Sequence, residues 1–106
     1  MARTTIRQAL LEVSRQWLQQ AADGHMAIET VDLYIQISER FDCFADAHGV
    51  HRMDDVTGQL TDRFVDAPGR DRRDRRDNIT LVPKDSTRRQ RRSALASLFA
   101  HARAST

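Results

Sequence analysis

Cysteine and long apolar runs are almost missing from this sequence. The single cysteine, Cys43, excludes an internal disulfide and is typical of a protein in a reducing compartment. No apolar run approaches the roughly 20 residues that a helix needs to span a bilayer, and no hydrophobic region of a signal peptide follows the first residues. These absences lead us to expect a cytoplasmic protein that has no membrane partner.

A standard set of metal ligands is also missing. The only candidates are Cys43, His48 and His51, with Asp42 and Asp46 nearby. A structural zinc site needs four ligands, normally with a tight pair of cysteines or histidines, and this spacing matches no such motif. We therefore expect neither metal nor cofactor, and we expect His48 in the core or at a helix cap.

Charge is unevenly distributed along the 106 residues, a length that fits one domain. The segment 70–92 contains ten Arg or Lys and four Asp, for a local charge of +6, whereas the remaining residues contain seven basic and eleven acidic side chains. The formal charge of +2 hides this asymmetry. Such segregation indicates a directed basic patch.

Hydrophobic periodicity predicts four helices, over about 5–22, 29–48, 57–67 and 87–103. Each helix has apolar residues at steps of three and four, and the first stripe places Trp17 in the core. The inner face of the second helix is expected to hold Thr30, Leu33, Tyr34, Ile37, Phe41, Phe44 and His48. Its outer face is acidic, with Glu29, Asp32, Glu39 and Asp46.

A long connection, residues 69–85, precedes the last helix. Its repeated Arg-Arg-Asp has almost nothing to bury, so we expect it to be mobile without a partner. Structureless loops of this length are uncommon in compact domains and often have a function.

The last helix is expected to begin at a capping pair, Ser86 and Thr87, and to carry four arginines in its first turns. Cations at the start of a helix oppose its dipole, so something other than helix stability selects them, and a polyanion is the obvious candidate. The expected buried stripe is Ala94, Leu95, Leu98, Phe99 and Ala102. The opposite face is expected to hold Arg89, Ser93, Ala96, Ser97 and Ala100.

Three segments resemble the N-terminal core-binding domain of tyrosine recombinases, the phage integrase family. Glu29-Thr30-Val31-Asp32-Leu33-Tyr34 with Phe41 and Phe44 is similar to the family pattern T-x-x-x-Y … F-x-x-F. Asp54-Asp55-Val56-Thr57 resembles the entry to its third helix. Ser86 to Phe99 is similar to s-T-x-x-x-r-x-s-A-L-r-x-L-F. The resemblance extends from about residue 5 to residue 102.

The resemblance implies an all-α, SAM-like four-helix bundle that forms one jaw of a clamp around duplex DNA, in a bacterial or phage-derived protein. In that family the second and fourth helices approach the major groove, and the outer side of the first helix can meet other recombinase subunits on DNA. A following catalytic domain supplies the tyrosine chemistry of DNA integration and recombination. Nothing in this chain corresponds to that domain, so we expect no enzymatic activity, and we expect a monomer before DNA is added.

Charge and resemblance together predict the residues at the DNA. In the last helix, Arg88, Arg91 and Arg92 are expected on phosphates and Arg89 nearest a base edge. The connection is expected to add non-specific phosphate contacts. The full expected set is Lys84, Thr87, Arg88, Arg89, Arg91, Arg92 and Ser93, with Arg72, Arg73, Arg75 and Arg76 in the connection.

Two alternative functions also fit the sequence. Ala45 and Gly49 have the four-residue gap of a helix-turn-helix regulator, although Gly58 stands where that motif needs a buried aliphatic residue and the preceding helix is long. The second alternative is a helical protein-interaction module, in which the basic patch binds an acidic partner and Trp17 anchors the interface.

Overall fold

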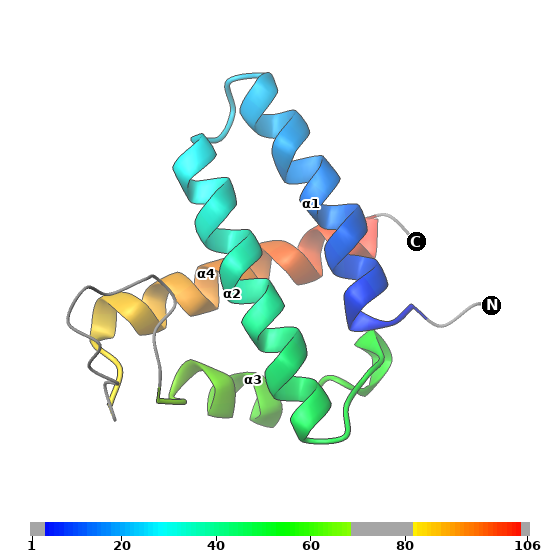
Figure 1. The fold of residues 1–106 in the computed structure, drawn as a ribbon, viewed down its shortest axis with the longest axis vertical. Helices are drawn as coiled ribbons and strands as arrows, with labels where there is room; N and C mark the ends of the chain where they lie inside the picture. Colours follow the sequence, from blue (N-terminus) through cyan, green and yellow to red (C-terminus); the bar gives the residue numbers. More distant parts are fainter. Residues whose placement is uncertain (1–3, 69–81, 105–106) are drawn as a thin grey trace.

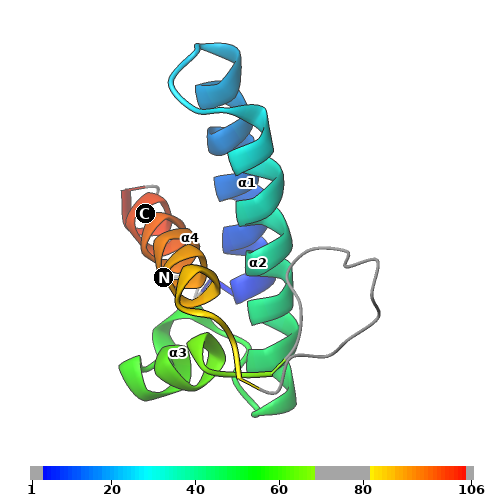
Figure 2. The ribbon, with the colours of Figure 1, turned by 90° about the vertical axis from the view of Figure 1, so that its left-hand side faces the viewer.

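The computed structural model describes residues 4–68 and 82–104, and within these ranges the fold is all-α. Helices α1 (Ile6–Ala22) and α2 (Ile28–Ala47) form an antiparallel hairpin. Helix α4 (Asp85–Ala104) crosses one side of this hairpin, and α3 (Gly58–Val65) packs below it against α2 and α4 (Figures 1 and 2). No helix in the described ranges is long and apolar enough to cross a membrane.

Helix α1 begins and ends where the sequence predicts. The Gln8 amide donates to Thr5 Oγ1 and the Thr5 amide donates to Gln8 Oε1, both at 3.0 Å, which is a capping box. At the other end Gly24 has a φ of +79°, a left-handed conformation that glycine adopts without strain. The two signals set the helix to Ile6–Ala22, within one residue of the expectation.

Helix α2 buries a somewhat different face from the one expected. Leu33, Ile37 and Phe41 are buried as predicted, but Val31, Ser38 and Ala45 are also buried, because α1 packs beside them as well as α4. His48 is exposed and is the C-cap residue of α2, with its Nδ1 atom 2.8 Å from the Phe44 carbonyl oxygen. The expectation for His48 is therefore wrong for the core and confirmed for the cap.

Residues 48–57 return the chain to the start of α1. They include a short 3₁₀ helix, η1 (Met53–Asp55), which the periodicity does not predict. The Ile6 amide donates to the His51 carbonyl at 2.8 Å, and the Met53 amide donates to the Thr4 carbonyl at 3.0 Å. These two bonds fasten the connection to the first residues of the bundle.

The core is centred on Trp17, which is fully buried as the sequence predicts. Its indole Nε1–H donates to Ser97 Oγ at 2.9 Å, and its ring meets the Tyr34 ring edge-on at a centroid distance of 5.5 Å. Phe41 makes similar edge contacts with Phe64 and Phe99. The aromatic side chains thus join all four helices in one core.

Helix α3 is shorter than expected, but it begins as predicted. Thr57 is its N-cap, and the Leu60 amide donates to Thr57 Oγ1 at 3.1 Å. Leu60 and Phe64 are buried one turn apart, and Val65 is buried beside them.

Helix α4 begins two residues earlier than predicted. The Arg88 amide donates to the Lys84 carbonyl at 3.0 Å, so the first turn already includes Ser86 and Thr87, which are not the caps. Asp85 in that turn is favourable because its carboxylate lies at the positive end of the helix dipole. Ala94, Leu95 and Leu98 are buried as expected, and Phe99 and Ala102 are half-buried against the same core.

Candidate nucleic-acid interface

The start of α4 is fastened to the end of α3 by Arg91. This side chain is 1% exposed, and its Nη1 atom donates to the carbonyl oxygens of Phe64, Val65 and Ala67 at 3.1, 3.0 and 2.7 Å. The last carbonyls of a helix have no partner within the helix, and they form the negative end of its dipole. Arg91 therefore caps α3 with a charged donor, and its guanidinium also lies over the Phe64 ring.

Two neighbouring arginines reach the same helix through carboxylates. Arg88 Nε lies 2.9 Å from Asp66 Oδ1, and Arg88 Nη1 lies 3.1 Å from Asp85 Oδ1. Arg92 Nη1 lies 3.3 Å from Asp62 Oδ1. The Arg88 and Arg92 side chains are 32% and 58% exposed, so solvent screens all three pairs and each contributes little to stability.

These contacts change the roles expected for Arg88, Arg91 and Arg92. The burial of Arg91 removes it from the surface, so the expected phosphate contact does not fit its position. Three arginines that oppose the dipole of their own helix lie beside the carboxyl end of α3, where carbonyls and carboxylates attract them. A sequence signal for Arg91 existed: it precedes Leu95 by four residues and so shares the buried stripe.

Small residues follow Arg89 on the outward side of α4. We define the α4 outer face as Arg89, Ser93, Ala96 and Ala100, all of which are exposed. Ser97, which was expected on this face, is half-buried and accepts the Trp17 indole hydrogen bond. Within the described ranges Arg89 has no ion pair, unlike Arg88 and Arg92.

The other expected DNA residues fall into two groups. Lys84 is exposed just before α4, and Thr87 is half-buried in its first turn. Arg72, Arg73, Arg75 and Arg76, and most of the connection expected to be mobile, lie outside the described residues.

Carboxylates at the end of α3 and in the first turn of α4 balance much of the charge at the α4 start. The basic residues there are Lys84, Arg88, Arg89 and Arg92, and the acidic residues are Asp62, Asp66 and Asp85. Sequence reasoning missed the roles of Asp62 and Asp66, because they precede their arginine partners by 30 and 22 residues. Among the described residues, Lys84 and Arg89 are the two of these basic side chains without a carboxylate partner.

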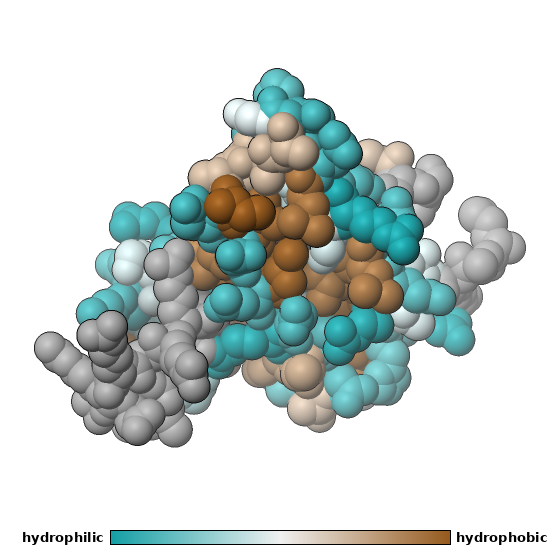
Figure 3. Space-filling model, turned by 45° about the horizontal axis from the view of Figure 1, so that its top comes forward, coloured by the Kyte–Doolittle hydropathy of each residue, from teal (hydrophilic) through white to brown (hydrophobic). Residues whose placement is uncertain are grey.

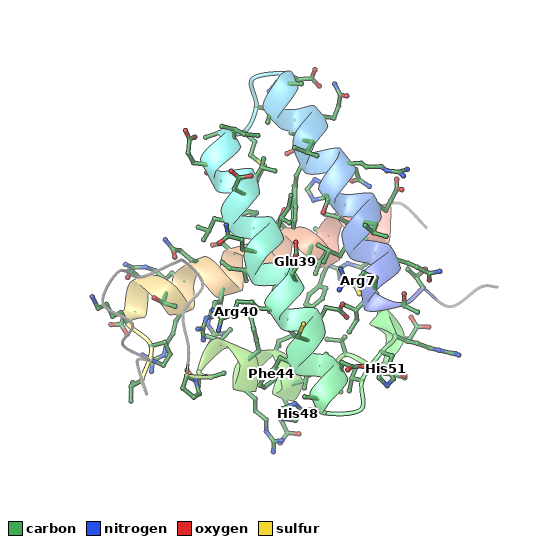
Figure 4. The ribbon with its side chains drawn as sticks, in the orientation of Figure 1. Arg7, Glu39, Arg40, Phe44, His48 and His51 are labelled. Carbon is green, nitrogen blue, oxygen red and sulfur yellow. The ribbon has the colours of Figure 1, made fainter. Side chains whose placement is uncertain are left out.

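The metal candidates do not form a three-ligand group in the described part of the chain. His48 and His51 lie near the end of α2 (Figure 4), where His51 Nδ1 is 2.8 Å from Asp46 Oδ1 and His48 binds the Phe44 carbonyl. Cys43 is exposed on the outer side of α2.

Residues 48–57 separate α2 from α3, and this connection contains η1. A helix-turn-helix motif joins its two helices by a turn of about three or four residues. The geometry between α2 and α3 does not follow that motif.

Comparisons of the chain with protein-family models, with curated proteins and with solved structures find no match.

Proposed function

We propose that this domain binds duplex DNA through the α4 outer face, in the manner of the core-binding domain of tyrosine recombinases. The observation that carries the proposal is the position of Arg89, which is exposed and unpaired within the described ranges on a face of small residues. Ser93, Ala96 and Ala100 let the helix approach a partner closely, and the major groove of DNA admits an α-helix.

The arginines then have different roles at the DNA. Arg89 lies outermost and is assigned to the groove, whereas Arg88 and Arg92 can exchange their exposed carboxylate partners for phosphates. Arg91 has a positioning role, because its bonds to α3 hold the first turns of α4 in place. Lys84 and the arginines of segment 70–76 are assigned to the phosphate backbone.

No strand cleavage is assigned to this chain. Tyr34, its only tyrosine, packs edge-on against the Trp17 ring in the bundle. In the resemblance that supports the proposal, the reaction belongs to a separate domain.

The test is fluorescence anisotropy of a labelled mixed-sequence duplex, titrated at several salt concentrations with heparin as a competitor. Arg89→Ala should weaken binding about tenfold and lower the log–log salt slope by about one, as expected for the loss of one contact to the DNA. Arg52→Ala is the matched control, because it removes the same charge from an exposed position outside α4.

Equal binding by the Arg89 and Arg52 variants would contradict the assignment of the α4 outer face. If the domain does not bind the duplex even at low salt, the proposed DNA-binding function is wrong. If the domain binds heparin more tightly than the duplex, the basic residues recognise polyanions in general and not DNA.

A further inference from the structure

Large apolar side chains gather on the side of the α1–α2 hairpin that faces away from α4. Leu11, Leu18 and Ile28 are 59%, 48% and 49% exposed, and Ile35 is half-buried beside them. Figure 3 shows this apolar area over α1 and α2. Ile35 also packs against the core, but Leu11, Leu18 and Ile28 contribute neither to the core nor to the proposed DNA contact. Exposed apolar side chains gathered on one side are typical of an interaction surface.

The same spacing occurs on both helices, with opposite charge in the middle. On α1 the exposed residues Leu11, Arg15 and Leu18 follow steps of four and three. On α2, Ile28, Asp32 and Ile35 follow the same steps. Such spacing places each set on one stripe of its helix. We call these six residues the hairpin face.

The two charged residues lie at nearly the same height along the hairpin. Arg7 Nε and Asp42 Oδ2 are 3.2 Å apart and fix the level of α1 against α2. Arg15 is eight residues from Arg7, and Asp32 is ten residues from Asp42, which is about 12 and 15 Å along the helix axes. Figure 4 shows Arg7 and Glu39 on this same side of the hairpin.

We propose that the hairpin face binds a second copy of this chain. A two-fold axis parallel to the hairpin places α1 of one copy over α2 of the other at equal height. Leu11 and Leu18 then oppose Ile28 and Ile35 of the second copy, and each Arg15 opposes an Asp32. An interface of this kind is isologous, since the same patch serves both subunits.

The charge pattern favours a copy of the same chain over other occupants. An acidic partner would meet repulsion from Asp32, and a basic partner would meet repulsion from Arg15. A second copy satisfies both charges at once and covers both apolar stripes. This association differs from the monomer expected from the resemblance, and it uses none of the residues of the α4 outer face.

Sedimentation equilibrium over a range of concentrations tests the association. The mass should rise from 12.2 kDa toward twice that value as the concentration increases to about 1 mM. Leu18→Glu should keep the chain at the single-copy mass throughout. Val82→Glu is the matched control, because it replaces an exposed apolar side chain of similar character outside the hairpin by the same charge. Far-UV circular dichroism checks that each variant keeps its helices.

A charge exchange tests the orientation of the two copies. Arg15→Asp and Asp32→Arg should each weaken association at least tenfold, because they place like charges opposite each other. The double variant should recover most of the wild-type association, since the pair is restored with its signs reversed.

Three outcomes would overturn the proposal. The wild-type chain could stay at the single-copy mass up to about 1 mM, and the partner of the hairpin face would then be a different protein. The Leu18 and Val82 variants could associate equally well. The double charge variant could remain as weak as the single variants, which would contradict the two-fold arrangement.

Discussion

Arg91 has a structural role inside the fold, although its place in a run of arginines suggests a contact with a polyanion at the surface. In sequence it belongs to a run of arginines at a helix start, which is typical of a polyanion contact. In the structure it is buried and donates to three carbonyls at the end of α3. The buried charge is tolerated because these acceptors are concentrated at the negative end of a helix.

Arg91→Met should therefore unfold the domain more easily while keeping a side chain of similar length. We expect the free energy of unfolding to fall by about 3 kcal/mol, because buried carbonyls lose their donor. Arg89→Met, on the exposed side of the same helix, should change it by less than about 0.5 kcal/mol. Urea denaturation followed by circular dichroism measures both, and equal losses would contradict the capping role.

At the scale of elements, α3 and α4 meet at ends of opposite polarity. The carboxyl end of α3 offers carbonyls, Asp62 and Asp66, and the amino-terminal turns of α4 offer Arg88, Arg91 and Arg92. These arginines interact unfavourably with the dipole of α4, but they stabilise the packing of α4 against α3. Their carboxylate partners also compete with any phosphate that approaches.

Asp66→Asn should consequently tighten DNA binding if the proposed interface is correct. The substitution releases Arg88 from a 2.9 Å ion pair and removes a repulsive charge near the phosphates. We expect affinity to rise about threefold at low salt and the salt dependence to steepen, with a loss of stability below about 1 kcal/mol. Glu12→Gln on α1 removes the same charge at an exposed position and should leave binding unchanged in the anisotropy titration. Weaker binding by the Asp66 variant would argue against Arg88 as a phosphate contact.

At the scale of the whole molecule, two surfaces lie on opposite sides of a thin bundle. Helix α4 covers one side of the hairpin, and the hairpin face lies on the other (Figure 2). The shortest extent of the molecule is 18 Å, which exceeds the Debye length of about 8 Å at physiological ionic strength. Charges on one side are therefore screened from a partner on the other.

The two proposed surfaces should respond independently to substitution. Leu18→Glu should abolish self-association and leave the affinity of one chain for a short duplex within about twofold, because the new charge is screened at that distance. Arg89→Ala should weaken DNA binding and leave the sedimentation profile unchanged. A loss of both properties in either variant would show that the surfaces overlap or depend on each other.

The sequence by itself determined the helices and most of the core. Capping residues such as Thr5 and Thr57 act on amides three residues away, and the spacing of Leu10, Val13 and Trp17 repeats with the helix turn. These signals are local, so periodicity alone places them. The exposure of Arg89, Ser93 and Ala96 on one side of α4 follows from the same geometry.

Only the tertiary structure decided which arginines face solvent and which are partnered. Arg88 and Arg92 meet carboxylates 22 and 30 residues earlier in the chain, and Arg91 meets carbonyls at the end of α3. The burial of Val31 and Ser38 depends on two helices packing against α2 together. Contacts of this kind depend on how the helices cross, and helix crossing is set by the fit of the whole core, which no local spacing records.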